Sequence, residues 1–158
     1  MKLAQIQMHV TADKAANLRH AEDLLRSVRG ADMAILPEMF CCPYDNACFR
    51  AYGEPEGGPA YQMLSRAARE LNLWLVGGSL PELDGDKIYN TAYVFDPTGT
   101  CVARHRKMHL FDIDVQGGQS FRESATLSPG SDITLFDTPY GRIGLCICFE
   151  LRPRRPST

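Results

Sequence analysis

Three residues that could act together in covalent chemistry lie far apart in the sequence. Glu38, Lys107 and Cys148 each come at or just after the end of a predicted strand. In open α/β sheets, sites gather at strand ends, where the backbone is rigid and side chains reach an open crevice. A thiol is a poor nucleophile until it loses its proton. A carboxylate can take that proton, and a lysine can stabilise the developing anion. These residue types therefore form a candidate catalytic set.

Each member of this set also has an ordinary structural explanation. Glu38 could be a solvated loop acid, Cys148 a buried thiol, and Lys107 a surface charge that contributes little to packing. The stretch GRIGLCICFELR, residues 141–152, holds two cysteines separated by one residue. Spacing alone leaves open which of the two is chemical and which is packing.

The elements that must position these side chains follow from the spacing of apolar residues. Alternation of period two and short apolar runs predict strands, whereas apolar residues on one helical face predict amphipathic helices. The predicted strands cover residues 4–10, 33–36, 73–79, 88–96, 101–107, 132–138 and 143–149. The predicted helices cover 13–30 and 63–71, long loops cover 38–59 and 108–130, and a turn covers 81–87. This order predicts an α/β fold with a mixed sheet and helices on at least one face.

Composition, charge and cysteine count exclude several classes of protein. A chain of 158 residues is long enough for one domain with a substantial core. Its net charge of −2 gives no basic bias toward nucleic acid. No apolar run reaches the roughly 18 residues that a membrane span requires. The N-terminus, MKLAQIQMHV, lacks the apolar core of a signal peptide, so we expect a cytoplasmic protein with free thiols. No cysteine pair has C-x-x-C spacing, which argues against a zinc site.

Three stretches, in order, resemble the catalytic signatures of the nitrilase, or carbon–nitrogen hydrolase, superfamily. They are LPEMF around Glu38, ARHRKMHLFD around Lys107 and GRIGLCICFELR around Cys148. The stretches LVGGSLPE, YNTAYVFDPTGT, HLFDID and ESATLSPG are similar to those of its omega-amidase branch. The resemblance covers nearly the whole chain up to Arg152. It implies the N-terminal part of a four-layer α-β-β-α sandwich and a hydrolase that needs no cofactor or metal.

The resemblance also implies the main catalytic roles. Cys148 is the nucleophile, Glu38 the general base, and Lys107 stabilises the oxyanion together with the backbone N–H of Phe149. Cys146 is left as packing. The implied substrate is the side-chain amide of a small 2-oxo acid, such as 2-oxoglutaramate or 2-oxosuccinamate, cleaved through a cysteine thioester with release of ammonia.

Three further residues are candidates for the same site. Glu123 resembles a second carboxylate that the superfamily places beside the triad, and a solvated loop acid is the competing interpretation. Tyr44 and Phe111 are candidates for lining the pocket, although aromatic residues near strand ends are more often packing.

Superfamily members are longer than this chain, which sets its expected domain limits. We assign residues 1–152 to an incomplete hydrolase domain and 153–158, PRRPST, to a non-family tail that suggests a truncated or frame-shifted reading. Two alternatives to the omega-amidase stay open. One is another amidase, nitrilase or carbamoylase of the superfamily, and the other is a non-catalytic fragment. We expect the isolated chain to be inactive and a full-length member to form homo-oligomers.

Overall fold

The computed structural model describes residues 1–118 and 120–151, so the predicted tail 153–158 lies outside the described residues. One six-stranded mixed sheet forms its centre, in the order β1-β2-β3-β5-β4, with β6 also paired to β5. The pairs among β1, β2 and β3 are parallel, and all pairs with β5 are antiparallel. The strands are β1 Leu3–Gln5, β2 Met33–Ile35, β3 Trp74–Val76, β4 Leu80–Asp84, β5 Lys87–Phe95 and β6 Cys101–Arg106.

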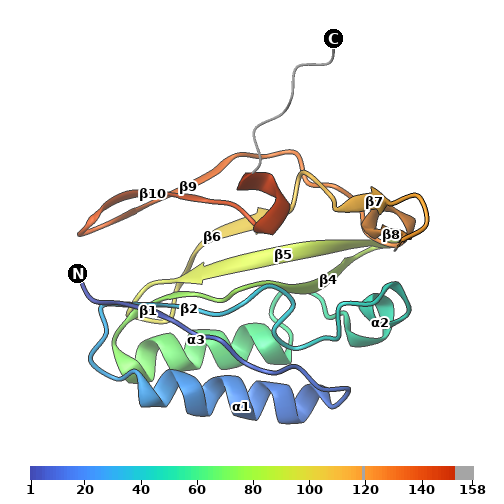
Figure 1. Ribbon diagram of the computed structural model, residues 1–158. Helices are drawn as coiled ribbons and strands as arrows, with labels where there is room; N and C mark the ends of the chain where they lie inside the picture. The colour runs from blue at the N-terminus through green and yellow to red at the C-terminus, as the bar shows by residue number, and fades with distance from the viewer. Residues whose placement is uncertain (119, 152–158) are drawn as a thin grey trace.

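Two helices, α1 (Lys14–Ser27) and α3 (Pro59–Leu71), cover one face of this sheet (Figure 1). Asp13 caps α1 by accepting a hydrogen bond from the backbone N–H of Ala16, which satisfies an N-terminal donor. Proline at the start of α3 is compatible with helix geometry, because the first N–H has no partner within the helix. Both predicted helices are confirmed, and their buried apolar faces join the main core under the sheet.

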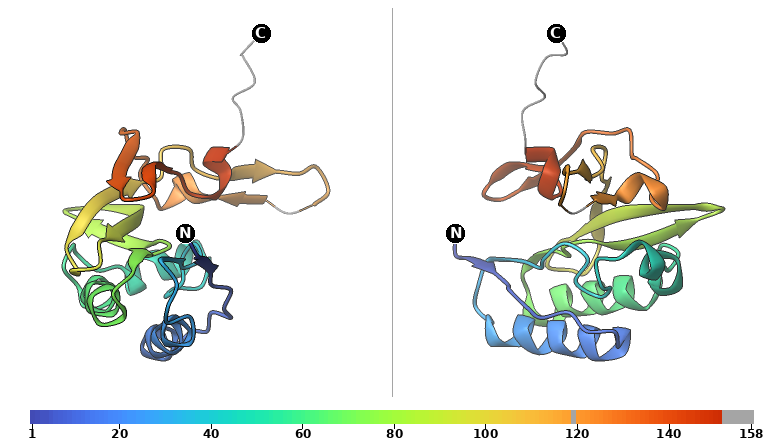
Figure 2. Two further views of the ribbon diagram at one scale, coloured as in Figure 1. Left: turned by 90° about the vertical axis from the view of Figure 1, so that its left-hand side faces the viewer. Right: turned by 45° about the vertical axis from the view of Figure 1, so that its right-hand side comes forward.

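The opposite face of the sheet is covered by a hairpin of β9 (Thr134–Thr138) and β10 (Gly141–Leu145) (Figure 1). Phe136 points inward from this hairpin and packs in a second apolar cluster with Val76 and Val94. Strand β5 lies between the helical layer and the hairpin, and its residues 88–95 are all buried. Helices, sheet and hairpin thus make three successive layers, which confirms the predicted α/β class (Figure 2).

One strand prediction and one turn prediction are wrong in extent. The strand predicted over 4–10 is confined to β1, because it can pair only with β2, which is equally short. The turn predicted over 81–87 is confined to Gly85 and Asp86, and the preceding residues form β4. Pro81 is tolerated within β4 because this strand lies at a sheet edge.

The two predicted long loops contain regular elements. Residues 38–59 include α2 (Asn46–Tyr52), capped by the side chain of Asp45. Residues 108–130 include β7 (Asp112–Asp114), β8 (Ser120–Arg122) and the 3-10 turn η1 (Glu123–Ala125). The β7–β8 hairpin projects from the side of the molecule (Figure 2). Within the described residues, no helix is both long and apolar enough to cross a membrane.

The last predicted strand, 143–149, is also too long. Strand β10 ends at Leu145, and the 3-10 turn η2 (Cys148–Leu151) follows it. Cys148 therefore lies beyond the strand, at a tight turn, rather than at its last position.

A close backbone contact at Gly78 holds the segment that follows β2. Gly78 has a φ of +59°, and a Cβ atom there would lie 2.1 Å from the carbonyl oxygen of Pro37. We expect Gly78→Ala to lower the free energy of unfolding by about 3 kcal/mol or more, since both backbone strain and a backbone clash are introduced. Chemical denaturation measures this value.

Gly85 provides the matched control, because its φ is +58° and a Cβ atom would meet nothing within 4 Å. We expect Gly85→Ala to cost only the left-handed strain of about 1 kcal/mol. Equal losses in the two variants would show that the contact with Pro37 has no energetic weight.

Candidate active site

Glu38 lies just beyond β2, in a segment clamped by the residues after β3. The backbone N–H of Met39 donates to Ser79 Oγ at 3.1 Å, and the N–H of Phe40 donates to the Ser79 carbonyl at 3.2 Å. Met39 has a φ of +51°, a conformation that non-glycine residues seldom adopt. The clamp therefore holds a sharp turn that presents the Glu38 carboxylate beyond the carboxyl end of β2, with its side chain 21% exposed.

Lys107 directly follows β6 and is completely buried. Its Nζ lies 2.8 Å from Glu38 Oε1 and 3.1 Å from Glu123 Oε1. Burial by itself would lower the pKa of Lys107, but the hydrogen bond and charge of Glu38 and the charge of Glu123 outweigh it and raise that pKa. The ammonium group thus stays charged between two carboxylates. The interpretation of Lys107 as a surface charge that contributes little to packing is therefore wrong.

Glu123, in η1, is also completely buried and not a solvated loop acid. Tyr44 Oη donates a hydrogen bond to its Oε1, and the backbone N–H of Phe111 donates to its Oε2. Burial and this hydrogen bond both raise the pKa of Tyr44, which keeps the phenol protonated as a donor. The structure therefore places two carboxylates, those of Glu38 and Glu123, on the Lys107 ammonium group.

Cys148 begins η2 and has a φ of +48°. This left-handed conformation costs free energy in a residue with a Cβ atom, and such strain often marks a functional turn. Burial raises the pKa of Cys148, and the negative charge of Glu38 and a hydrogen bond to it raise this pKa further, against the opposing effect of Lys107. The resting group is therefore a thiol next to a carboxylate that can accept its proton.

The other cysteines differ from Cys148 in their surroundings. Cys146 is exposed, as Cys148 is, so its assignment as a packing residue is wrong; it follows the end of β10 and does not enter the core. Cys41 and Cys42 are buried, and burial raises the pKa of each to about 12. Such thiols remain protonated and inert at neutral pH.

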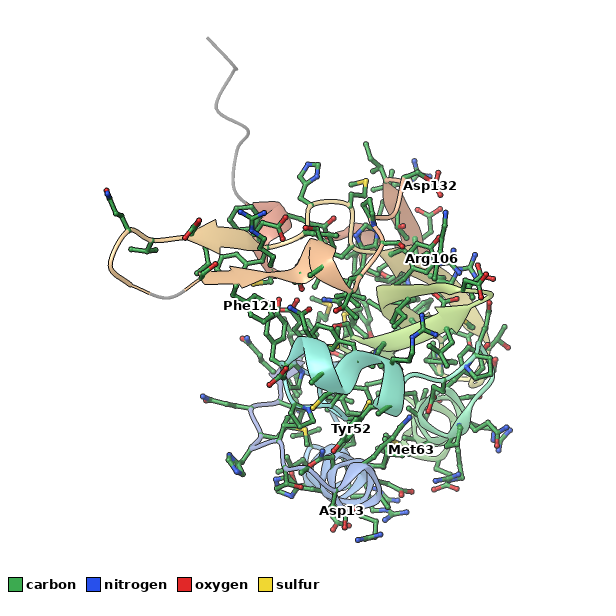
Figure 3. All side chains as sticks on the ribbon, turned by 90° about the vertical axis from the view of Figure 1, so that its right-hand side faces the viewer. Asp13, Tyr52, Met63, Arg106, Phe121 and Asp132 are labelled. Atoms are coloured by element: carbon green, nitrogen blue, oxygen red, sulfur yellow. The ribbon has the colours of Figure 1, made fainter. Side chains whose placement is uncertain are left out.

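Aromatic side chains line the cleft around these groups. Tyr44, Phe111 and Phe149 lie with Glu38 and Cys148 on a cleft of about 610 Å³. The rings of Phe111 and Phe149 meet edge to face at 5.4 Å. Tyr44 also contacts Phe121, which lies on the β7–β8 hairpin above α2 (Figure 3). Both predicted lining residues therefore face the candidate site.

Asn90 is a site residue that the sequence interpretation missed. It lies on β5, is completely buried, and donates from Nδ2 to Glu38 Oε1 at 2.8 Å. The same oxygen accepts from Lys107, so both donors engage one side of the Glu38 carboxylate. Its backbone carbonyl accepts from the Lys107 N–H at 2.8 Å. The available signal was an amide side chain, next to Thr91, in a strand whose other residues from Ile88 to Phe95 are apolar or aromatic.

A buried charge cluster of this kind makes Lys107 important for stability. We expect Lys107→Met to lower the free energy of unfolding by about 3 kcal/mol, because it leaves the buried Glu123 carboxylate without its cation. Urea denaturation at neutral pH measures the loss.

A second variant isolates the charge contribution. Adding Glu123→Gln to Lys107→Met removes the unpaired anion, and we expect the double variant to recover part of the lost stability. The pairing would be contradicted if the double variant lost as much free energy of unfolding as Lys107→Met and Glu123→Gln lose separately, added together.

Within residues 1–118 and 120–151, no group of three or more His, Cys, Asp or Glu side chains is arranged to hold a metal ion. The chemistry available to the described residues is that of a thiol, two carboxylates and an ammonium group. These groups suit nucleophilic attack by sulfur with proton transfer to and from a carboxylate.

Comparisons with known proteins identify the family of this chain. The family model described as carbon-nitrogen hydrolase matches residues 2–155. The omega-amidase NIT2 of Danio rerio is 47% identical over 153 residues, which cover 96% of this chain and 55% of that protein. The omega-amidase NIT2 of Bos taurus is 49% identical over the same shares. This chain thus spans about half the length of these relatives.

A solved structure supports the fold. Saccharomyces cerevisiae Nit3, described as a member of branch 10 of the nitrilase superfamily, is 37% identical. It superposes with a TM-score of 0.82 over 95% of this chain and 56% of that one. The fold, the order of the signatures and the family match together lead to one conclusion: the chain belongs to the carbon–nitrogen hydrolase family of the nitrilase superfamily.

Proposed function

We propose that this chain carries the catalytic groups of an amidase that hydrolyses a small amide through a thioester on Cys148. The observation that carries the proposal is the position of Glu38. Its carboxylate binds the buried Lys107 ammonium at 2.8 Å and also faces the Cys148 thiol. One carboxylate thus lies between the cation and the nucleophile, where a proton must move during attack.

Glu38 would act first as general base. Because the pKa of Cys148 is raised, its resting thiol keeps its proton until an acceptor is in place. As sulfur forms a bond to the amide carbon, the thiol proton passes to Glu38. The carbonyl oxygen becomes an oxyanion, which Lys107 and the backbone N–H of Phe149 would stabilise.

Breakdown of the tetrahedral intermediate returns the proton. Glu38 would donate it to the amide nitrogen, the carbon–nitrogen bond breaks, and ammonia leaves. The acyl group remains on Cys148 as a thioester. A water molecule, deprotonated by Glu38, then attacks the thioester, which releases the carboxylic acid and restores the thiol.

The substrate class rests on the relatives. The similar proteins of Danio rerio and Bos taurus are named omega-amidases. We therefore propose the side-chain amide of a small 2-oxo acid, such as 2-oxoglutaramate or 2-oxosuccinamate, as the substrate. Comparing ammonia release from these amides with release from nitriles and carbamoyl amines would separate this activity from others of the superfamily.

The nucleophile can be identified by mass. The chain would be studied alone and as a chimera completed with the remaining residues of the Danio rerio omega-amidase. When the chimera is mixed with 2-oxoglutaramate, we expect an acyl adduct on Cys148 and release of ammonia from the substrate. Cys148→Ala should abolish both, with a loss of about 10⁴-fold or more in kcat, as for removal of other essential nucleophiles.

Cys146→Ala is the matched control, because Cys146 is an exposed thiol only two residues away. We expect it to keep most of the activity. An acyl adduct on Cys146 or on Cys42 would overturn the assignment of Cys148.

A further inference from the structure

Glu150 lies two residues beyond Cys148 and takes no part in the proposed proton transfers. Its side chain is only 2% exposed. Its Oε1 accepts from the backbone N–H of Met108 at 2.6 Å. Its Oε2 accepts from the backbone N–H of Ile147 at 2.6 Å and lies 2.9 Å from Nε2 of His105. One buried carboxylate therefore binds three nitrogen groups, two in the segment 105–108 and one at Ile147.

The two backbone donors are the immediate neighbours of the reacting groups. Met108 follows Lys107, and Ile147 precedes Cys148. The Glu150 N–H also donates to the Ile147 carbonyl at 3.2 Å, which closes the turn that contains Cys148. The carboxylate thus links the segment that carries the cation to the strained turn that carries the nucleophile.

His105 holds this carboxylate from the other side. It is 1% exposed on β6, and its Nδ1 lies 3.0 Å from Thr134 Oγ1 on β9. A carboxylate oxygen only accepts hydrogen bonds, so the proton between His105 and Glu150 lies on Nε2. Burial would raise the pKa of Glu150, but hydrogen bonds from His105, Ile147 and Met108 outweigh burial and lower it. Glu150 is therefore an anion with its acceptors filled.

We infer that Glu150, oriented by His105 and Thr134, is a positioning residue that holds Cys148 in its left-handed turn beside Glu38 and Lys107. The inference rests on the proposed function only in taking Cys148 as the reacting thiol. Glu150 touches none of the reacting atoms and acts through the peptide groups that it binds.

The rate of alkylation at each cysteine of the 158-residue chain tests this role. Iodoacetamide is applied over a range of pH, and peptide mass spectrometry gives the rate for each thiol. In the unaltered chain, burial and the charges of Glu38 and Glu123 raise the pKa of Cys148 while Lys107 lowers it, so its profile lies at high pH.

Glu150→Gln is the principal variant. Its amide group places a donor where the carboxylate accepted, so at least one N–H loses its partner and the turn loosens. Cys148 then moves away from Glu38, whose charge and hydrogen bond raise its pKa, and its alkylation profile shifts to lower pH, toward that of an ordinary thiol. Cys146 is exposed as well and should keep its profile, whereas the buried Cys41 and Cys42 should stay protected because the fold persists.

Glu54→Gln is the matched control. Glu54 is 4% exposed and likewise accepts from two backbone N–H groups, of Ala60 and Tyr61, and from one cationic side chain, Lys14. It caps α3 on the helical side of the sheet. We expect this variant to leave the Cys148 profile unchanged, which separates positioning from the general loss of a buried carboxylate.

A graded pair at Thr134 tests the link through His105. Thr134→Val removes the hydroxyl that His105 contacts and should shift the Cys148 profile in the same direction as Glu150→Gln, by a smaller amount. Thr134→Ser keeps the hydroxyl and should recover most of that shift. If Glu150→Gln exposes Cys41 and Cys42, its fold is lost, and the Thr134 pair decides the question.

An unchanged Cys148 profile in both Glu150→Gln and Thr134→Val, with Cys41 and Cys42 protected, would overturn the inference. Amide hydrolysis by the chimera tests the function separately, where a displacement of about 1 Å costs roughly 10²-fold in kcat. A shifted profile without any amide turnover in the unaltered chimera would reject the proposed function and leave the positioning role intact.

Discussion

The buried ammonium group of Lys107 is the interaction on which the arrangement of the site depends. A charged group loses its hydration on burial, and it is tolerated only with well-placed opposite charges. Glu38 and Glu123 supply these charges from segments on either side, at 2.8 and 3.1 Å. Glu38 also accepts from the Asn90 side chain, and Glu123 accepts from the Tyr44 hydroxyl and the Phe111 N–H, so the pairing orders three segments that are remote in sequence.

The sheet provides the rigid base for this cluster. Strand β5 is covered on both faces and carries Asn90, which contacts Glu38 through its side chain and Lys107 through its backbone. The segments after β2 and β6 leave the sheet close to this point. The cation and the base are therefore positioned by strands, whereas the nucleophile lies on a turn that needs separate support.

The turn at Cys148 receives that support from the outer layer. The β9–β10 hairpin packs on the sheet through Phe136, and Thr134 at its start contacts His105. His105 and Glu150 continue this contact to both neighbours of the reacting groups. These contacts connect the hairpin to the segments that carry Lys107 and Cys148.

The sequence by itself determined the α/β class, both long helices and the candidate set of Glu38, Lys107 and Cys148. The spacing of apolar residues and the three ordered signatures are local properties of the chain, so they can be recognised without coordinates. Only the tertiary structure decided that Lys107 and Glu123 are buried, that Asn90 and Glu150 belong to the site, and that Cys146 is exposed. The strand predicted through Cys148 ended early because the turn is held by Glu150, and two of its three partners, His105 and Met108, lie 45 and 42 residues away in the chain. Burial and hydrogen bonding between distant segments have no local pattern, since they arise only when the layers pack together.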